Sequence, residues 1–150
     1  MARTILAVDD NPVIRETLAI WLSAAGHQVV CAPSGLDAVQ LLEQRKFDLV
    51  ILDVEMPGLT GFDVLAMVQR RTLCPGTPIM MLTASDYADD IVRARDLGAC
   101  GYLNKPFSPE GLLDKIERVL EARDTLWIDD FHCIVGQASD GAAVKAPRAA

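Results

Sequence analysis

Five polar side chains in this sequence follow short apolar runs, and their types are those used in phosphoryl chemistry. They are Asp9, Asp10, Asp53, Thr83 and Lys105. Carboxylates that lie close together repel one another unless a cation binds between them. Magnesium prefers carboxylate and phosphate oxygens as ligands, and a lysine adds a second positive charge. If the fold gathers these residues, they predict a site for Mg²⁺ and a phosphoryl group.

The residue types also indicate separate roles within such a site. Asp53 stands alone after the apolar run Leu49–Leu52, so it is the best candidate for a nucleophile that forms an aspartyl phosphate. Asp9 and Asp10 are candidate metal ligands. Lys105 would neutralise charge on the transferring oxygens, and Thr83 would supply a hydroxyl donor.

The elements that must position these residues alternate between two patterns. The first is a continuous apolar run, which is typical of parallel strands covered on both faces. These runs are Ile5–Val8, Val29–Cys31, Leu49–Leu52, Ile79–Leu82 and Tyr102–Leu103.

Segments with helical periodicity lie between and after these runs. Asn11 and Ser108 are predicted N-caps, each followed by a proline that is tolerated in a first turn, and Gly26 and Gly98 follow predicted helix ends. The predicted helices contain Ile14 to Ala25, Leu36 to Leu42, Phe62 to Val68, Asp86 to Leu97, and Pro109 to Leu120.

Five strand–helix units in sequence predict an α/β fold. Their lengths favour a flavodoxin-like, doubly wound, five-stranded parallel sheet of order 2-1-3-4-5 with five helices. The first and third strands are neighbours in that order. The carboxylates of Asp9 and Asp10 should therefore converge with that of Asp53 beyond the carboxyl ends of the strands.

With these motifs in place, the chain resembles the receiver domains of two-component response regulators, including chemotaxis-type regulators. Each motif alone is weak, but the four together, each at the end of its own strand, are specific. The resemblance covers about residues 3–123. The matching segments are Val8–Asn11, Leu52–Gly58 followed by Gly61, Leu82–Ala84, and Tyr102–Phe107.

The resemblance implies a role for each matching position. Asp53 would be the phosphoacceptor, and Mg²⁺ would be held by Asp9, Asp10, Asp53 and the backbone carbonyl of Glu55. Lys105 would contact the phosphoryl group, and its bond to Pro106 is typically cis in the family. Thr83 and Tyr102 would be switch residues, which reshape the face formed by the fourth helix, fifth strand and fifth helix.

The function that the resemblance implies is a phosphorylation-dependent signalling switch. The protein would not be an enzyme beyond self-phosphorylation and slow autodephosphorylation. A histidine kinase or a histidine phosphotransfer protein would supply the phosphoryl group. A downstream effector protein or a lost output domain would read the switched face, and a homodimer through that face is a further expectation.

The composition of the chain limits which classes of partner and which cellular location are expected. The chain has 150 residues, a mass of 16.3 kDa and a net charge of −7, which argues against direct nucleic-acid binding. No apolar run reaches the ~20 residues that a membrane span needs, so no membrane partner is expected. Four scattered cysteines without a secretion signal indicate reduced thiols and a cytoplasmic location.

Residues 1–123 are predicted to form the receiver domain, and residues 124–150 a C-terminal tail or linker that is partly disordered. Within the tail, Leu126–Ile128 and Phe131–Val135 flank Asp129 and Asp130, which indicates a hairpin or a partner-docking segment. The end from Gly141 to Ala150 is rich in alanine and is expected to be disordered.

Other functions fit less well. A Mg²⁺-dependent phosphohydrolase also uses a strand-end aspartate, but its D-x-D-x-T/V pattern does not match Asp9-Asp10-Asn11-Pro12. A flavin or nucleotide module would need a glycine-rich loop after the first strand. A receiver fold used only for docking would not need the full acidic set. The sequence leaves open whether this is a stand-alone receiver or the N-terminal part of a longer regulator.

Overall fold

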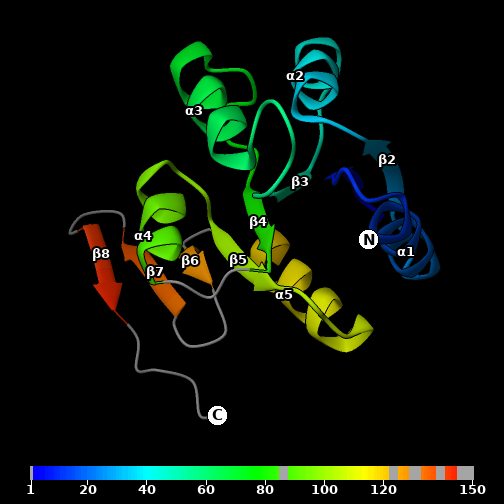
Figure 1. Cartoon of the computed structure of the whole chain (residues 1–150). Helices are drawn as coiled ribbons and strands as arrows, with labels where there is room; N and C mark the ends of the chain where they lie inside the picture. The colour runs from blue at the N-terminus through cyan, green and yellow to red at the C-terminus, as the bar shows by residue number, and fades with distance from the viewer. Residues whose placement is uncertain (1, 85–87, 122–124, 129–132, 138–140, 145–150) are drawn as a thin grey trace.

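A computed structural model describes residues 2–84, 88–121, 125–128, 133–137 and 141–144 of the chain (Figure 1). The helices are α1 (Pro12–Ala24), α2 (Gly35–Gln44), α3 (Gly61–Arg71), α4 (Ala88–Asp96) and α5 (Pro109–Glu121). The strands are β1 (Thr4–Val8), β2 (Gln28–Ala32), β3 (Leu49–Asp53), β4 (Ile79–Thr83), β5 (Gly101–Asn104), β6 (Thr125–Ile128), β7 (Cys133–Gln137) and β8 (Gly141–Val144).

The first five strands form a parallel sheet in the order β2-β1-β3-β4-β5. This order and the five helices confirm the predicted doubly wound fold. The register places Val8 of β1 beside Leu52 of β3, so Asp9 and Asp53, one residue further along each strand, end at the same edge. The switch in strand order that makes β1 and β3 neighbours therefore brings the acidic residues together, as the sequence predicted.

Two hydrophobic layers explain why the strands are apolar at every position. Leu6 and Val8 of β1 pack into one layer, and Ile5 and Ala7 pack into the other. Helices α2, α3 and α4 cover the first layer, whereas α1 and α5 cover the second (Figure 1). Alternate side chains of a strand point to opposite faces, so a sheet covered on both sides needs apolar residues throughout.

Helices α1 and α5 begin at the predicted caps. The Asn11 side chain accepts a hydrogen bond from the Val13 amide at 2.9 Å, and the Ser108 hydroxyl accepts one from the Gly111 amide at 2.9 Å. At α3, Thr60 and Asp63 form a reciprocal capping box. Helix α4 is described from Ala88 onward, and Asp86, where the sequence predicts its start, lies outside the described residues.

The sheet continues past β5 with three strands from the C-terminal segment, beyond the five that were predicted. Strands β6 and β7 pair antiparallel, as the hairpin prediction for this segment indicated. Strand β6 joins β5 through one residue pair, Gly101 with Ile128.

The alanine-rich end shows the main local difference from expectation. Gly141–Val144 was expected to be disordered, but these residues form β8 and pair with four positions of β7. Backbone pairing needs no large side chain, so a periodicity of apolar residues cannot reveal such a strand. Residues 145–150 lie outside the described part of the chain.

None of the described helices is both long enough and apolar enough to cross a membrane.

Candidate functional site

The carboxyl ends of β1 and β3 bring three aspartates together. One carboxylate oxygen from each of Asp9, Asp10 and Asp53 lies within 4.8 Å of the others. Asp9 and Asp53 are almost completely buried, with 0% and 1% of their surfaces exposed, and Asp10 is exposed. This is the cluster that the spacing of the sequence predicted.

Lys105 lies between the two buried carboxylates. Its Nζ is 2.9 Å from Asp9 Oδ2 and 3.1 Å from Asp53 Oδ1. The lysine arrives from the end of β5, where the bond between Lys105 and Pro106 is cis. Its amide donates to the Thr83 carbonyl at 2.7 Å, which ties this segment to the end of β4.

The charges of this cluster are unbalanced. Burial, and next the charge of Asp9, raise the pKa of Asp53 from 3.8 to about 7, although Lys105 partly opposes them. Burial lowers the pKa of Lys105, but its contacts with Asp9 and Asp53 outweigh burial and leave that pKa raised. Two buried carboxylates with one lysine thus have room for another positive charge.

Unused acceptors also point to a cation. Among the described residues, Asp53 Oδ2 is buried and accepts no hydrogen bond, and Asp9 Oδ2 has only its ion pair with Lys105. Buried carboxylate oxygens are normally satisfied. Three carboxylates with free oxygen lone pairs match the ligands that Mg²⁺ prefers, so these residues fit that ion.

Backbone amides hold the carboxylates in place. The Asn11 amide donates to Asp9 Oδ1 at 2.9 Å, and the Glu55 amide donates to Asp53 Oδ1 at 3.3 Å. Each aspartate is therefore fixed by the residue two positions further along the chain, which is the usual geometry of an Asx turn. The Arg15 side chain donates to the Asp9 carbonyl at 2.8 Å and links α1 to the same turn.

Gly61 sits against the backbone of the nucleophile candidate. A Cβ at this position would collide with the Asp53 carbonyl oxygen and would lie 2.8 Å from the Val54 Cα. The Gly61 amide donates to the Val54 carbonyl at 2.9 Å. Gly61 therefore lets the start of α3 approach the end of β3, a role in the site that its loop motif did not reveal.

Thr83 ends β4 beside this cluster. Its side chain is fully buried, and its hydroxyl donates to Glu55 Oε1 at 3.4 Å. Glu55 is exposed in the loop after β3. The sequence predicted a role for the Glu55 backbone carbonyl, whereas the contact made by its side chain was not foreseen.

Tyr102, the second predicted switch residue, lies in β5 and is 1% exposed. It packs in the layer under α4, together with Met81 and Ala94. Lys115 of α5, also buried, donates from Nζ to the Tyr102 carbonyl at 3.0 Å. Lys115 escaped the sequence reasoning, although a lysine between Leu112 and Ile116 on an apolar stripe was a usable signal.

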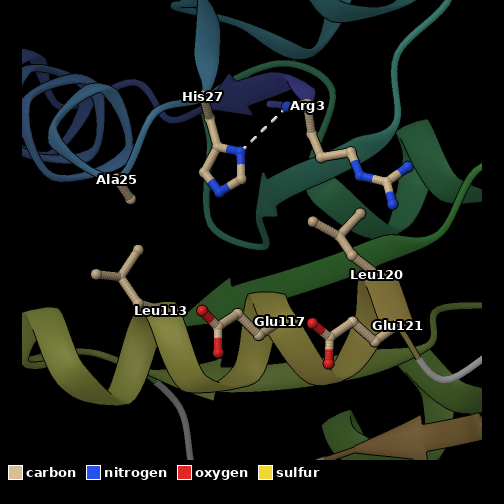
Figure 2. A pocket seen from close by; sticks show the side chains of 7 residues that line it. All are labelled: Arg3, Ala25, His27, Leu113, Glu117, Leu120 and Glu121. Atoms are coloured by element: carbon tan, nitrogen blue, oxygen red, sulfur yellow. Dashed lines mark hydrogen bonds between the residues drawn. The ribbon is translucent and has the colours of Figure 1, made fainter. Parts of the chain in front are cut away.

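A different pocket lies at the opposite edge of the sheet, at the amino ends of β1 and β2 (Figure 2). The backbone amide of Arg3 donates to His27 Nδ1 at 3.2 Å there. The pocket has a volume of about 150 Å³, and Glu117 and Glu121 of α5 are among the residues that line it. None of the predicted site residues lines this pocket. The pocket is therefore separate from the acidic cluster at the carboxyl edge of the sheet.

Comparisons with known proteins match this geometry. The family model of the response regulator receiver domain covers residues 5–117. The transcriptional regulatory protein GltR of Pseudomonas aeruginosa is 43% identical over 118 residues, which are 79% of this chain and 49% of that protein. The phosphate regulon regulator PhoB of the same organism is 37% identical over 120 residues, which are 80% and 52%.

Solved structures give the same result. The chemotaxis protein CheY4 of Vibrio cholerae is 38% identical with a TM-score of 0.76, and the match covers 80% of this chain and 100% of that one. A receiver domain protein from Methanospirillum hungatei is 28% identical with a TM-score of 0.76, covering 82% and 97%. The chain spans about half the length of the curated relatives PhoB and GltR.

The sheet order, the acidic cluster with its lysine and the family match agree, and the chain belongs to the response regulator receiver domains of two-component systems.

Proposed function

We propose that this protein is a signalling switch that accepts a phosphoryl group on Asp53 from a histidine kinase or a histidine phosphotransfer protein. The observation that carries the proposal is the buried Asp53 carboxylate, which contacts Lys105 and keeps one oxygen free of hydrogen bonds from described residues. Receiver domains are generally signalling domains, so no turnover of an external substrate is proposed. Self-phosphorylation and slow autodephosphorylation are the only reactions.

Asp53 Oδ2 is the attacking atom in this proposal. It forms a bond to phosphorus while the bond from phosphorus to the donor imidazole nitrogen breaks, and the electron pair leaves with the imidazole. The carboxyl group must be deprotonated to attack. Lys105 supports the ionised form and lies beside the place where the phosphoryl oxygens would gather.

Receiver domains bind Mg²⁺ in general, and the acidic cluster fits that ion. We propose that Asp9, Asp10, Asp53 and the Glu55 backbone carbonyl hold it. The ion would neutralise negative charge on the transferring phosphoryl oxygens. Asp9 and Asp10 would hold the ion beside Asp53. The Asn11 amide orients the Asp9 carboxylate, and the Glu55 amide orients the Asp53 carboxylate.

The response is proposed to spread from Thr83 and Tyr102 to the face formed by α4, β5 and α5. The Lys105 amide bonds to the Thr83 carbonyl, and Lys115 of α5 bonds to the Tyr102 carbonyl, so both switch residues are tied to neighbouring elements. A phosphoryl group would bias two arrangements of these contacts.

The receiver unit is proposed to comprise residues 1–123, with residues 124–150 as a separate C-terminal segment, and the location is proposed to be cytoplasmic. The reader of the switched face would be an effector protein, an output domain of a longer regulator, or a second copy of the chain. The curated relatives, named as transcriptional regulators, are about twice as long as the matched part.

Intact-protein mass after incubation with Mg²⁺ and a small acyl phosphate tests the proposal. The parent should gain one phosphoryl group, and Asp53→Asn should gain none. Asp114→Asn, which removes an exposed carboxylate of α5, is the matched control and should behave like the parent. A phosphorylated Asp53→Asn protein would refute the assignment. If the parent gains nothing, a titration with beryllofluoride and Mg²⁺ decides whether Asp53 can hold a phosphoryl-like group.

A further inference from the structure

Arg15 lies in the first turn of α1, and its side chain reaches back to the end of β1. Its amide donates to the Asn11 carbonyl at 3.1 Å, and its Nη1 donates to the Asp9 carbonyl at 2.8 Å. The second bond has the length of a strong charge-assisted hydrogen bond. It joins the start of a helix to the strand end that carries two of the three clustered aspartates.

The charge of Arg15 is unfavourably placed for the helix itself. The amino end of a helix carries partial positive charge, so a cation in the first turn is repelled. The first turn of α1 contains no acidic residue that would offset this repulsion. The contact of the guanidinium with the Asp9 carbonyl therefore explains this residue better than helix stability does.

This contact fixes the peptide group between Asp9 and Asp10. A peptide group is planar, so holding its carbonyl oxygen also sets the direction in which the chain continues to the next Cα. The Asp10 side chain branches from that Cα. Arg15 therefore acts on the direction of the Asp10 side chain through the backbone.

The Asp10 carboxylate depends on its backbone more than the other two carboxylates do. The Asn11 amide orients the Asp9 carboxylate, the Glu55 amide orients that of Asp53, and Lys105 contacts both. Among the described residues, the exposed Asp10 carboxylate accepts no hydrogen bond and forms no ion pair. Its place within 4.8 Å of the other two carboxylates is therefore set by the main chain.

We infer that Arg15 is a positioning residue of the metal site, which holds the peptide between Asp9 and Asp10 so that the Asp10 carboxylate faces the other two. The inference rests on the proposed function, because it concerns the Mg²⁺ ligands proposed there. Arg15 contacts a carbonyl oxygen that is not among those ligands, so it acts on the ion only through Asp10.

The sign of one change in affinity tests this inference. Arg15→Met removes the donor and the charge but keeps a long side chain that suits a helix. Loss of a group that holds a metal ligand in place typically weakens metal binding by about 10–100-fold. The removed positive charge works in the opposite direction, so we expect the Mg²⁺ dissociation constant to rise by about threefold to tenfold. Charge repulsion alone predicts a lower constant, and a lowered or unchanged constant in calorimetric titration would overturn the inference.

Two further variants separate the hydrogen bond from the charge. Arg15→Lys keeps a positive charge and a donor, so its Mg²⁺ affinity should return to within about twofold of the parent. Arg70→Met is the matched control, because Arg70 is an exposed arginine in the last turn of α3. It should leave the affinity unchanged. A loss in Arg70→Met equal to that in Arg15→Met would attribute the effect to net charge and would overturn the inference.

A double-mutant cycle with Asp10→Ala tests whether Arg15 acts through Asp10. Once the Asp10 carboxylate is absent, there is nothing left for Arg15 to position. Arg15→Met should then change the Mg²⁺ dissociation constant by no more than about twofold. The same loss in both backgrounds would show that Arg15 acts by another route and would overturn the assignment.

A readout in the metal-free chain follows the peptide group itself. The residual dipolar coupling of the Asp10 amide reports the orientation of its N–H bond. The parent and Arg15→Lys should share one value, and Arg15→Met should differ at Asp10 while residues of β3 keep theirs. An unchanged value at Asp10 would refute the positioning role. Arg15→Gln, which keeps a shorter neutral donor, replaces Arg15→Met if that variant does not fold, and the same outcomes decide. If the parent binds no Mg²⁺, the proposed function fails at its metal site, but the couplings still decide whether Arg15 positions Asp10.

Discussion

Asp53 carries an unfavourable charge in the metal-free fold. Burial and the nearby Asp9 carboxylate raise its pKa to about 7, and Lys105 offsets only part of this cost. A carboxylate with this environment is poor as a structural group, because an apolar or amide side chain would be easier to bury. The same environment suits a nucleophile that is charged once a cation is bound.

The raised pKa predicts a pH-dependent gain in stability for Asp53→Asn. Between about pH 4 and pH 7 the unfolded chain loses the Asp53 proton while the folded chain retains it, so the parent loses unfolding free energy as pH rises. Asparagine does not titrate. The variant should therefore exceed the parent by about 1–3 kcal/mol at pH 8 and by much less at pH 4.

Urea unfolding at several pH values, without and with Mg²⁺, measures this difference. Mg²⁺ should stabilise the parent at pH 8 and should reduce the gap, because it favours the charged carboxylate. A gap that stays constant from pH 4 to pH 8 would contradict the assigned environment of Asp53.

Asp10 tests the metal site without disturbing the core, because its side chain is exposed. Asp10→Ala should raise the Mg²⁺ dissociation constant tenfold or more, about 1.4 kcal/mol. Without Mg²⁺ its stability should equal or slightly exceed that of the parent, since one repulsion is removed. Calorimetric titration beside Asp114→Ala as control measures this, and an unchanged constant would remove Asp10 from the site.

At the scale of elements, the approach of α3 to the end of β3 fixes the Asp53 backbone. Gly61 permits that approach, and no side chain fits between it and the Asp53 carbonyl. The loop between the two elements is shaped by turn residues, among them Gly58 with φ of 76°. Gly61 at the start of α3 and Gly58 in the preceding loop thus act through different physical causes, which are steric contact and backbone conformation.

Gly61→Ala and Gly58→Ala form a matched pair. Gly61→Ala should cost about 1–3 kcal/mol through overpacking and should also weaken Mg²⁺ binding, because the Asp53 backbone must move. Gly58→Ala has open space and should cost about 1–2 kcal/mol through its left-handed backbone, with Mg²⁺ binding retained. Thermal unfolding and Mg²⁺ titration of both variants check this, and equal effects on Mg²⁺ would contradict the steric argument.

The sequence was informative wherever a residue acts through its type and its place at a strand end. Asp9, Asp10, Asp53 and Lys105 were predicted together because parallel strands end at one edge, and the structure brings them together. The contacts of Gly61 with the Asp53 backbone and of the Glu55 side chain with Thr83 were not predicted, because they depend on the close approach of a helix and on one rotamer. Neither leaves a periodic signal in the sequence.

At the scale of the whole molecule, the C-terminal strands join the sheet of the receiver unit through fewer residue pairs than neighbouring strands within that sheet share. Strands β4 and β5 pair at four positions, whereas β5 and β6 pair at one. Strand β8, in turn, pairs with β7 at four positions. The apolar runs of the sequence were sufficient to predict the first five strands. Strand β8 depends on backbone pairing, which an alanine-rich sequence does not reveal.

Because β6 pairs with β5 at one position only, we expect a chain shortened to residues 1–123 to keep the fold and the site. Every residue that is assigned to the two hydrophobic layers lies between β1 and the end of α5, so we expect this part of the chain to pack on its own. The melting temperature should fall by no more than about 4 °C, and Mg²⁺ affinity should stay within about twofold. Circular dichroism and calorimetry measure both, and loss of cooperative unfolding would show that β6–β8 belong to the receiver unit.

The sheet separates two layers that have no side chains in common, one under α2, α3 and α4 and one under α1 and α5. Each layer can accumulate compensating changes of volume without forcing changes in the other. Over evolutionary time, surfaces supported by α1 and surfaces supported by α4 can therefore diverge at different rates on one scaffold. A protein engineer can use the same partition by repacking the layer around Leu18 and Ile116 while leaving Tyr102 and its neighbours as they are.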